Sequence, residues 1–184
     1  DELENELIGL GAEVLKCCFD VREFEEVKKY LGDLNGKWAD IDVLVNNAGG
    51  ALGKEPIQDG AIEDWDAMID TNVKGLLYVT KVLLPIMCKN QKGHIVNLCS
   101  IAGKQVYSEG NVYCAAKHAV DAISKGISDP LKSIRLISFW ATVMSAVLPV
   151  VSKIAMGLPY DRFFLIMTLY PILKLLYAIY CQIV

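Results

Sequence analysis

The sequence is poor in the groups that bind metals and nucleic acids. It contains two histidines, and no two of its six cysteines form a C-x-x-C pair. A zinc site is therefore not expected, and reduced thiols are the default for cysteines in apolar runs. The formal net charge of −4 offers no basic surface to a nucleic acid. We expect neither a metal nor a nucleic-acid partner, and reduced cysteines favour the cytoplasm.

The N-terminal residues also lack the features of a signal peptide. The chain begins Asp-Glu-Leu-Glu-Asn-Glu-Leu, without an initiating methionine. Leu3, Leu7 and Leu10 share one helical face, and Gly9 and Gly11 end that helix. The opening therefore looks like the last part of a longer helix, and we expect the chain to be a fragment.

The sequence does contain an alternation of strand-like and helical segments. Strands are expected at 13–19, 41–45, 93–99 and 134–139, and helices at about 22–34, 63–90 and 111–128. This alternation predicts an α/β fold built on a doubly wound parallel sheet. The strand at 41–45 is largely apolar, as in a parallel sheet covered on both faces. A length of 184 residues suits one domain with a sizeable core.

Small residues follow the strand at 41–45. The sequence continues Asn46-Asn47-Ala48-Gly49-Gly50. At the carboxyl edge of such a sheet, small residues let the backbone approach a ligand. The spacing alone fits a plain turn equally well, so both interpretations stay open at this point.

Ser100, Tyr113 and Lys117 supply groups suited to proton transfer. Ser100 closes the strand at 93–99, and Tyr113 and Lys117 are four residues apart, so they share one face of the helix at 111–128. A hydroxyl, a phenol and an ammonium are what a site needs to move a proton between a carbonyl and an alcohol. Each residue alone has an ordinary structural explanation, and only their joint spacing indicates catalysis.

Together these motifs resemble those of the classical short-chain dehydrogenases/reductases. That family's order and spacing are matched by Asn46-Asn47-Ala48-Gly49, by Asn72 within Asp70-Thr71-Asn72-Val73-Lys74-Gly75, by Ser100, and by Tyr113-x-x-x-Lys117. The resemblance covers about residues 1–139 and implies a Rossmann-like dinucleotide-binding fold.

The resemblance implies four catalytic residues: Asn72, Ser100, Tyr113 and Lys117. Tyr113 would be the acid/base that exchanges a proton with the substrate oxygen, and Ser100 would hydrogen-bond that oxygen, so both would bind substrate. Lys117 would stabilise the phenolate form of Tyr113 and bind the nicotinamide ribose. Asn72 would hold a water molecule in a proton relay that continues through the lysine.

The resemblance also implies a cofactor that carries the hydride. Asp20 looks like the family's aspartate that contacts adenine, with Val21 beside it. Asn47, Ala48 and Gly49 would line the adenosine ribose, and Tyr113 and Lys117 would complete the cofactor site. The implied cofactor is NADP. NAD stays open, because the strand end that distinguishes the two cofactors is not found in the sequence.

Three longer segments are similar to one branch of the family. Residues 47–56, 63–72 and 110–113 resemble enzymes that act on serine, allo-threonine and 3-hydroxy acids, use NADP and form tetramers through two long helices. This implies an oxidoreductase for a 3-hydroxy acid or hydroxy amino acid. It also implies a homo-oligomer, a tetramer or dimer, formed through helices 63–90 and 111–128. The alternatives are an inactive or membrane-attached remnant, or an enzyme for a steroid or acyl-carrier substrate.

The sequence departs from the family pattern at both ends. The family begins with a strand and a glycine-rich turn that cradles the pyrophosphate at a helix N-terminus, and the sequence lacks both. After Phe139 the expected Pro-Gly and substrate lid are also missing. We therefore expect a partial dinucleotide-binding catalytic domain at 1–139, without the first βαβ unit, and a divergent apolar tail at 140–184.

Three interpretations of the tail stay open. The segment 163–184 is long and apolar enough for a membrane helix, although Lys174 would be costly in mid-membrane. The tail is otherwise an unusual buried segment, or the product of a frameshift between about 127 and 142. The frameshift is suggested by codons for a typical late helix of the family, which give residues 172–176 when read one base later.

Overall fold

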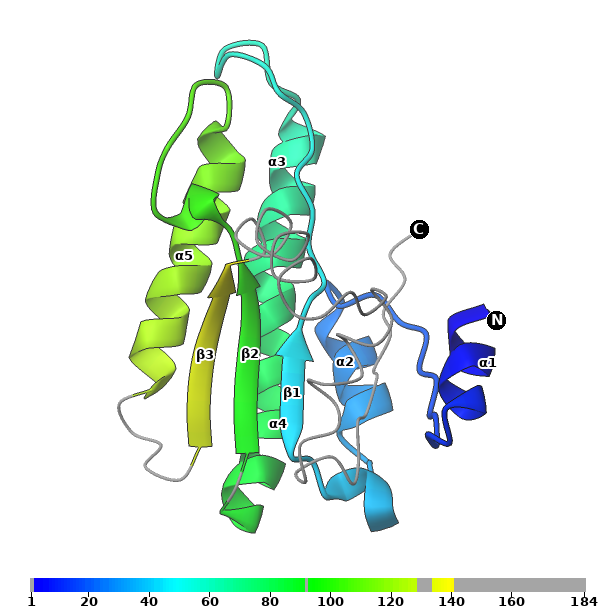
Figure 1. The fold of residues 1–184 in the computed structure, drawn as a ribbon. Helices are drawn as coiled ribbons and strands as arrows, with labels where there is room; N and C mark the ends of the chain where they lie inside the picture. Colours follow the sequence, from blue (N-terminus) through cyan, green and yellow to red (C-terminus); the bar gives the residue numbers. More distant parts are fainter. Residues whose placement is uncertain (1, 92, 129–133, 141–184) are drawn as a thin grey trace, which may run out of the picture.

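Three parallel strands and their connecting helices form the described part of the protein. The computed structural model describes residues 2–91, 93–128 and 134–140. The strands β1 (Val43–Asn46), β2 (Gly93–Cys99) and β3 (Ile134–Trp140) lie in the order β1-β2-β3 (Figure 1). In this register Asn46 is paired with Asn97. The predicted α/β fold with a parallel sheet is confirmed.

Five α-helices accompany the sheet in the described ranges. They are α1 (Glu2–Gly9), α2 (Phe24–Leu31), α3 (Ile62–Ile69), α4 (Leu76–Asn90) and α5 (Asn111–Ser128). Short 3₁₀ turns occupy Gly36–Ala39 and Ile101–Gly103. The prediction was accurate for the strand at 93–99 and the helix at 111–128, and the strand at 134–139 runs one residue further.

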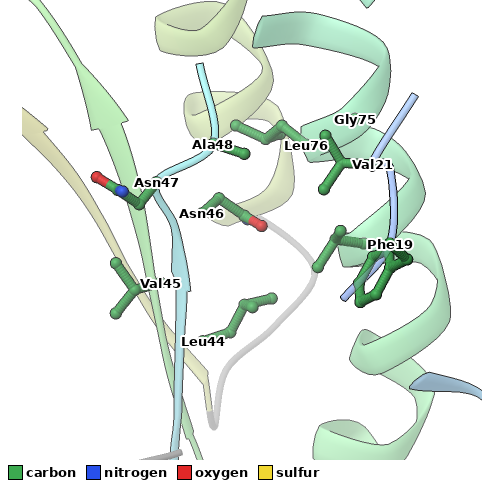
Figure 2. Close-up of a pocket in the computed structure, with 10 residues that line it drawn as sticks. Phe19, Val21, Leu44, Val45, Asn46, Asn47, Ala48, Gly75 and Leu76 are labelled. Atoms are coloured by element: carbon green, nitrogen blue, oxygen red, sulfur yellow. The ribbon is translucent and has the colours of Figure 1, made fainter. Parts of the chain in front are cut away.

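The core lies between the sheet and the helices α4 and α5. The strand side chains on this side are buried, namely Leu44, Asn46, Ile95, Asn97 and Cys99. Val45 points the other way (Figure 2) and is 47 % exposed. The apolar sequence of 41–45 predicted cover on both faces, but within the described residues the second face is open at Val45.

The helix α2 packs against α4 through a short apolar stripe. Val27 and Leu31 are fully buried, and Phe24 meets the ring of Tyr78 edge-on, with centroids 5.2 Å apart. Burying each aliphatic side chain is worth about 2 kcal/mol. The predicted helix at 22–34 is too long, because Gly32 and the polar residues after it do not sustain a helix.

The predicted strand at 13–19 is not formed. Cys17 and Phe19 are buried and Lys16 and Cys18 are not, so the burial alternates as in a strand. A strand also needs a neighbour for its backbone hydrogen bonds. In the described residues β1 pairs only with β2, and no strand pairs with residues 13–19. The segment therefore packs on the core without joining the sheet.

The predicted helix at 63–90 is present but not uniform. α3 and α4 are joined by a π-helical segment, Asp70–Gly75, which contains the buried Asn72. The helix continues through Pro85 to Asn90. π-Helical turns inside longer helices are rare and occur often at functional sites.

The predicted tail at 140–184, apart from Trp140, lies outside the described residues, as do its three interpretations. In the part of the chain that the structure describes, no helix is both long and apolar enough to cross a membrane.

Candidate active site

Lys117 is held near Tyr113 by the backbone of β2. Both residues project from α5, and the Lys117 Nζ atom lies 5.8 Å from the centroid of the Tyr113 ring. Lys117 is buried, and its Nζ donates a hydrogen bond of 2.9 Å to the carbonyl of Leu98. Burial lowers the pKa of Lys117, because a charged ammonium is less stable away from water. The carbonyl contact keeps the group in a defined position beside the phenol ring.

Ser100 stands at the point where β2 ends. It is buried, and its Oγ accepts a hydrogen bond of 3.2 Å from the backbone N–H of Ala102. This bond caps the 3₁₀ turn that follows. A hydroxyl that accepts such a bond still has its own hydrogen to donate to another oxygen.

Within the described residues, only the nitrogen of the Asn72 side-chain amide has hydrogen-bond partners. Its Nδ2 donates to the carbonyls of Gly50 and Met68, at 2.9 and 2.8 Å. Its Oδ1 is buried and accepts no hydrogen bond from the described residues. An unpaired buried acceptor is costly, about 1–3 kcal/mol, so this atom indicates a place for a hydrogen-bond donor.

Gly49 brings the loop after β1 against Asn72 and Lys117. A Cβ atom at this glycine would lie 2.5 Å from Oδ1 of Asn72 and 3.7 Å from Nζ of Lys117. Residues predicted from three separate motifs therefore meet at one point. Only a residue without a side chain fits there.

Val21, Asn47 and Ala48 line a small cavity of about 130 Å³ between β1 and the segment before α2 (Figure 2). Gly75 also lines it, and a Cβ there would lie 2.8 Å from Cγ2 of Val21. The structure thus brings these three predicted cofactor residues together. The cavity also has apolar walls that the sequence did not indicate, including Phe19 and Leu76.

Asp20 is not among the residues that line this cavity. Its carboxylate is bound by the guanidinium of Arg22, with Nε at 2.8 and 3.0 Å from the two oxygens, and by the backbone N–H of Arg22 at 2.9 Å. The side-chain hydrogen bond from Arg22 holds the pKa of Asp20 below its usual range. Asp20 is therefore fixed as a carboxylate by a residue that the sequence did not single out.

A second cavity, of about 340 Å³, is lined by Tyr113. Its walls come from the loop after β1, residues 51–55, from Trp65 and Met68, and from the loop and first turn of α5 at 107 and 109–113. Ser100 is not among the lining residues. Tyr113 is thus the predicted catalytic residue that lines this cavity.

A network of buried polar side chains lies in the core beside the site. Asn46 Nδ2 donates to Asn97 Oδ1 at 2.8 Å and to Thr80 Oγ1 at 3.1 Å, and Asn97 Nδ2 donates to Ser124 Oγ at 2.9 Å. The network links α4, β1, β2 and α5. Sequence reasoning overlooked Asn97 and Ser124, although an asparagine inside an apolar strand was a visible signal.

The model of the short chain dehydrogenase family matches residues 1–150. The chain belongs to this family. It is 47 % identical over 122 residues to an NADP-dependent 3-hydroxy acid dehydrogenase of Salmonella typhi, covering 66 % of this chain and 49 % of that protein. It is 41 % identical over 140 residues to a serine 3-dehydrogenase of Agrobacterium fabrum, covering 75 % of this chain and 56 % of that protein.

Solved structures of the short chain dehydrogenase family have the same fold. The closed form of a serine dehydrogenase complexed with NADP⁺ matches with a TM-score of 0.68 and 28 % identity, covering 95 % of this chain and 86 % of that chain. The chain spans about half the length of the curated relatives it matches. The predicted membership of the family is therefore confirmed, while the motifs' roles and those of single residues stay predictions.

Proposed function

We propose that this chain is the catalytic part of an NADP-dependent oxidoreductase that acts on 3-hydroxy acids or hydroxy amino acids. The observation that carries the proposal is the buried Lys117 ammonium, held by the Leu98 carbonyl 5.8 Å from the centre of the Tyr113 ring. The names of the curated relatives support the substrate class and the cofactor.

In this proposal, side chains of α5 and of the end of β2 carry out the proton transfer. Tyr113 accepts the proton of the substrate hydroxyl, and the nearby ammonium of Lys117 stabilises the phenolate that this requires. Ser100 donates its hydroxyl hydrogen to the substrate oxygen. Asn72 offers its unpaired Oδ1 to a water molecule that returns protons to the solvent.

The residues present fit one part of the cofactor. Val21, Asn47 and Ala48 would hold the adenosine half, with Asp20 beside them, and Lys117 the nicotinamide ribose. The space that Gly49 leaves beside Asn72 and Lys117 fits the close approach of a ligand. When bound, NADP supplies the hydride acceptor. NAD is the alternative cofactor.

The remaining parts of the proposal concern the whole protein. We propose a homo-oligomer formed through the helices at about 63–90 and 111–128, located in the cytoplasm. The alternative is an inactive remnant of the fold. This alternative needs a test because the chain spans only 49 % of the Salmonella relative.

The test is an activity measurement on a chimaera. An N-terminal glycine-rich segment of the kind that the family resemblance implies is joined to residues 1–184, and NADPH formation is followed with L-serine or 3-hydroxypropionate. We expect turnover that falls at least about 100-fold in Tyr113→Phe, the size of a lost acid/base contribution. Tyr30→Phe is the matched control, because the Tyr30 ring stacks on Phe19, lies beside Lys29 and lines neither cavity. Full activity in Tyr113→Phe would overturn the assignment.

A further inference from the structure

The hydroxyl, phenol and ammonium proposed for proton transfer come from two separate elements. Ser100 stands at the end of β2, whereas Tyr113 and Lys117 project from α5. Between them the chain forms the 3₁₀ turn Ile101–Gly103 and a loop up to Gly110. Figure 1 shows this turn lying against α5 at the end of β2. The place of the Ser100 hydroxyl relative to the phenol therefore depends on what fastens the turn to the helix.

The backbone of the turn packs directly on the backbone of α5. A Cβ atom at Gly103 would lie 2.6 Å from the carbonyl oxygen of Lys117 and 2.7 Å from Sγ of Cys99. The Cys99 thiol donates a hydrogen bond of 3.3 Å to the same carbonyl oxygen. The turn is thus seated on α5 at the level of Lys117, at a distance that only glycine permits.

A charged hydrogen bond fastens the turn at a second point, further along α5. Lys104, the residue after the 3₁₀ turn, donates from its Nζ to Oδ2 of Asp121 at 2.6 Å. Asp121 is buried, and a hydrogen bond between two charged groups is stronger than one between neutral groups. Lys125 donates to the same oxygen at 2.7 Å, but it belongs to α5 itself. Of these two lysines, Lys104 is the one that connects the turn to the helix.

The turn transmits this attachment to Ser100 through its own hydrogen bonds. The Ser100 Oγ accepts a bond from the N–H of Ala102 at 3.2 Å, and the Ser100 carbonyl accepts one from the N–H of Gly103 at 2.9 Å. The carbonyl of Ile101 accepts a bond from the N–H of Lys104 at 2.9 Å. These bonds make Ser100 and Lys104 parts of one short, closed unit, so a shift of one moves the other.

We propose that Lys104 is a positioning residue: its bond to Asp121 holds the turn after β2 against α5 and thereby places the Ser100 hydroxyl for proton transfer at Tyr113. The inference rests on the proposed function, which assigns that hydroxyl to the substrate oxygen. Lys104 itself contacts neither substrate nor cofactor. Its loss leaves the proton-transfer groups present but Ser100 less well fixed, and small displacements of such groups lower the rate strongly.

The first test measures amide hydrogen exchange in the full 184-residue chain by NMR. The reporters are the N–H groups of Ala102 and Gly103, because both bond to Ser100. We expect Lys104→Met to speed their exchange about tenfold, since the turn opens more often without its attachment. Lys104→Arg keeps a cation that can bind the carboxylate, so exchange at both reporters is expected to stay within about twofold of the wild type.

Lys125→Met is the matched control. It removes a bond to the same oxygen of Asp121, but from a lysine within α5. Exchange at both reporters is therefore expected to stay within about twofold of the wild type. A general loss of stability would instead speed the exchange alike in the two methionine variants, and that result overturns the inference. Wild-type exchange at both reporters in Lys104→Met overturns it equally.

Activity separates a failure of this inference from a failure of the proposed function. In the chimaera, Lys104→Met is expected to lower kcat with L-serine about tenfold and to leave KM for NADP within about twofold, because other segments line the cofactor cavity. Unchanged turnover of L-serine in this variant contradicts the inference alone. Fast exchange of the two reporters in Lys104→Met, in a protein whose chimaera forms no NADPH, contradicts the proposed function alone.

Discussion

At Gly49 the space for a side chain is taken by two functional groups. The position that a Cβ would occupy lies 2.5 Å from Oδ1 of Asn72 and 3.7 Å from Nζ of Lys117. A methyl group there displaces the amide, and with it the hydrogen bonds of Asn72 to Gly50 and Met68. The glycine is therefore required by contact with the site and not only by the turn.

We expect Gly49→Ala to lower the free energy of unfolding by about 1–3 kcal/mol, the usual cost of overpacking. Gly50→Ala is the matched control, since a Cβ at Gly50 meets no atom within 4 Å. Its effect is expected to stay within about 0.5 kcal/mol. Urea unfolding of the two variants measures the difference, and equal stabilities would contradict the packing argument.

Asp121 carries a pH-dependent part of the stability. Burial tends to raise the pKa of Asp121, but hydrogen bonds from Lys104 and Lys125, at 2.6 and 2.7 Å, together bring it below its usual value. A carboxyl with a lowered pKa in the folded state stabilises the protein above its unfolded pKa, about 3.9, and loses this effect as pH falls through the folded value.

We expect Asp121→Asn to lower the free energy of unfolding by about 1 kcal/mol at pH 7. The difference in this free energy between the variant and the wild type is expected to vanish as the pH falls below about 4. Denaturant unfolding at several pH values measures it. Asp33→Asn, at an exposed position, is the control and is expected to show no such pH-dependent difference. A constant difference across the pH range would speak against the ion pairs as its cause.

At the scale of secondary-structure elements, the network of buried polar side chains fixes the position of α5 relative to the sheet. Asn97 of β2 joins Asn46 of β1 and Ser124 of α5. The Tyr113 and Lys117 side chains depend on the position of that helix, because both project from it. The network is therefore a positioning device for the site, buried in the core.

We expect Asn97→Leu to destabilise the protein by about 1–3 kcal/mol, because Asn46 and Ser124 each lose one buried hydrogen bond. Asn90→Leu, which loses one bond to the Ala39 carbonyl at the end of α4, is expected to cost less. Thermal unfolding with circular dichroism compares the two variants. If both substitutions lower the stability equally, the buried network does not stabilise the protein more than a single partly buried hydrogen bond does.

Elements were predicted well where local patterns decide them. β2 and α5 have strong apolar periods, and their bounds were predicted within a residue. Residues 13–19 have the apolar composition of a strand but not its partner, so the prediction was wrong. The π-helical segment around Asn72 was not predicted. The Asn72 side chain donates a hydrogen bond to Gly50, 22 residues away, and a local sequence pattern does not reveal such a contact.

For the molecule as a whole, the proposed cofactor site is only partly built from these residues. The adenosine and nicotinamide contacts are proposed, but the sequence holds no glycine-rich turn between a strand and a helix for the pyrophosphate. We expect residues 1–184 alone to bind NADP with a dissociation constant above about 0.1 mM. Isothermal titration calorimetry measures it, and a micromolar constant would overturn this expectation.

By itself, the sequence determined the family, the parallel α/β fold and the chemical types at the site. These follow from spacing along the chain, such as the four-residue step from Tyr113 to Lys117. Only the tertiary structure decided which groups meet. Gly49, Asn72 and Lys117 come from three distant segments, and the cavity beside Tyr113 is lined by residues of the loop after β1, of α3 and of the start of α5. Contacts of this kind depend on how the elements pack, which a local pattern does not specify.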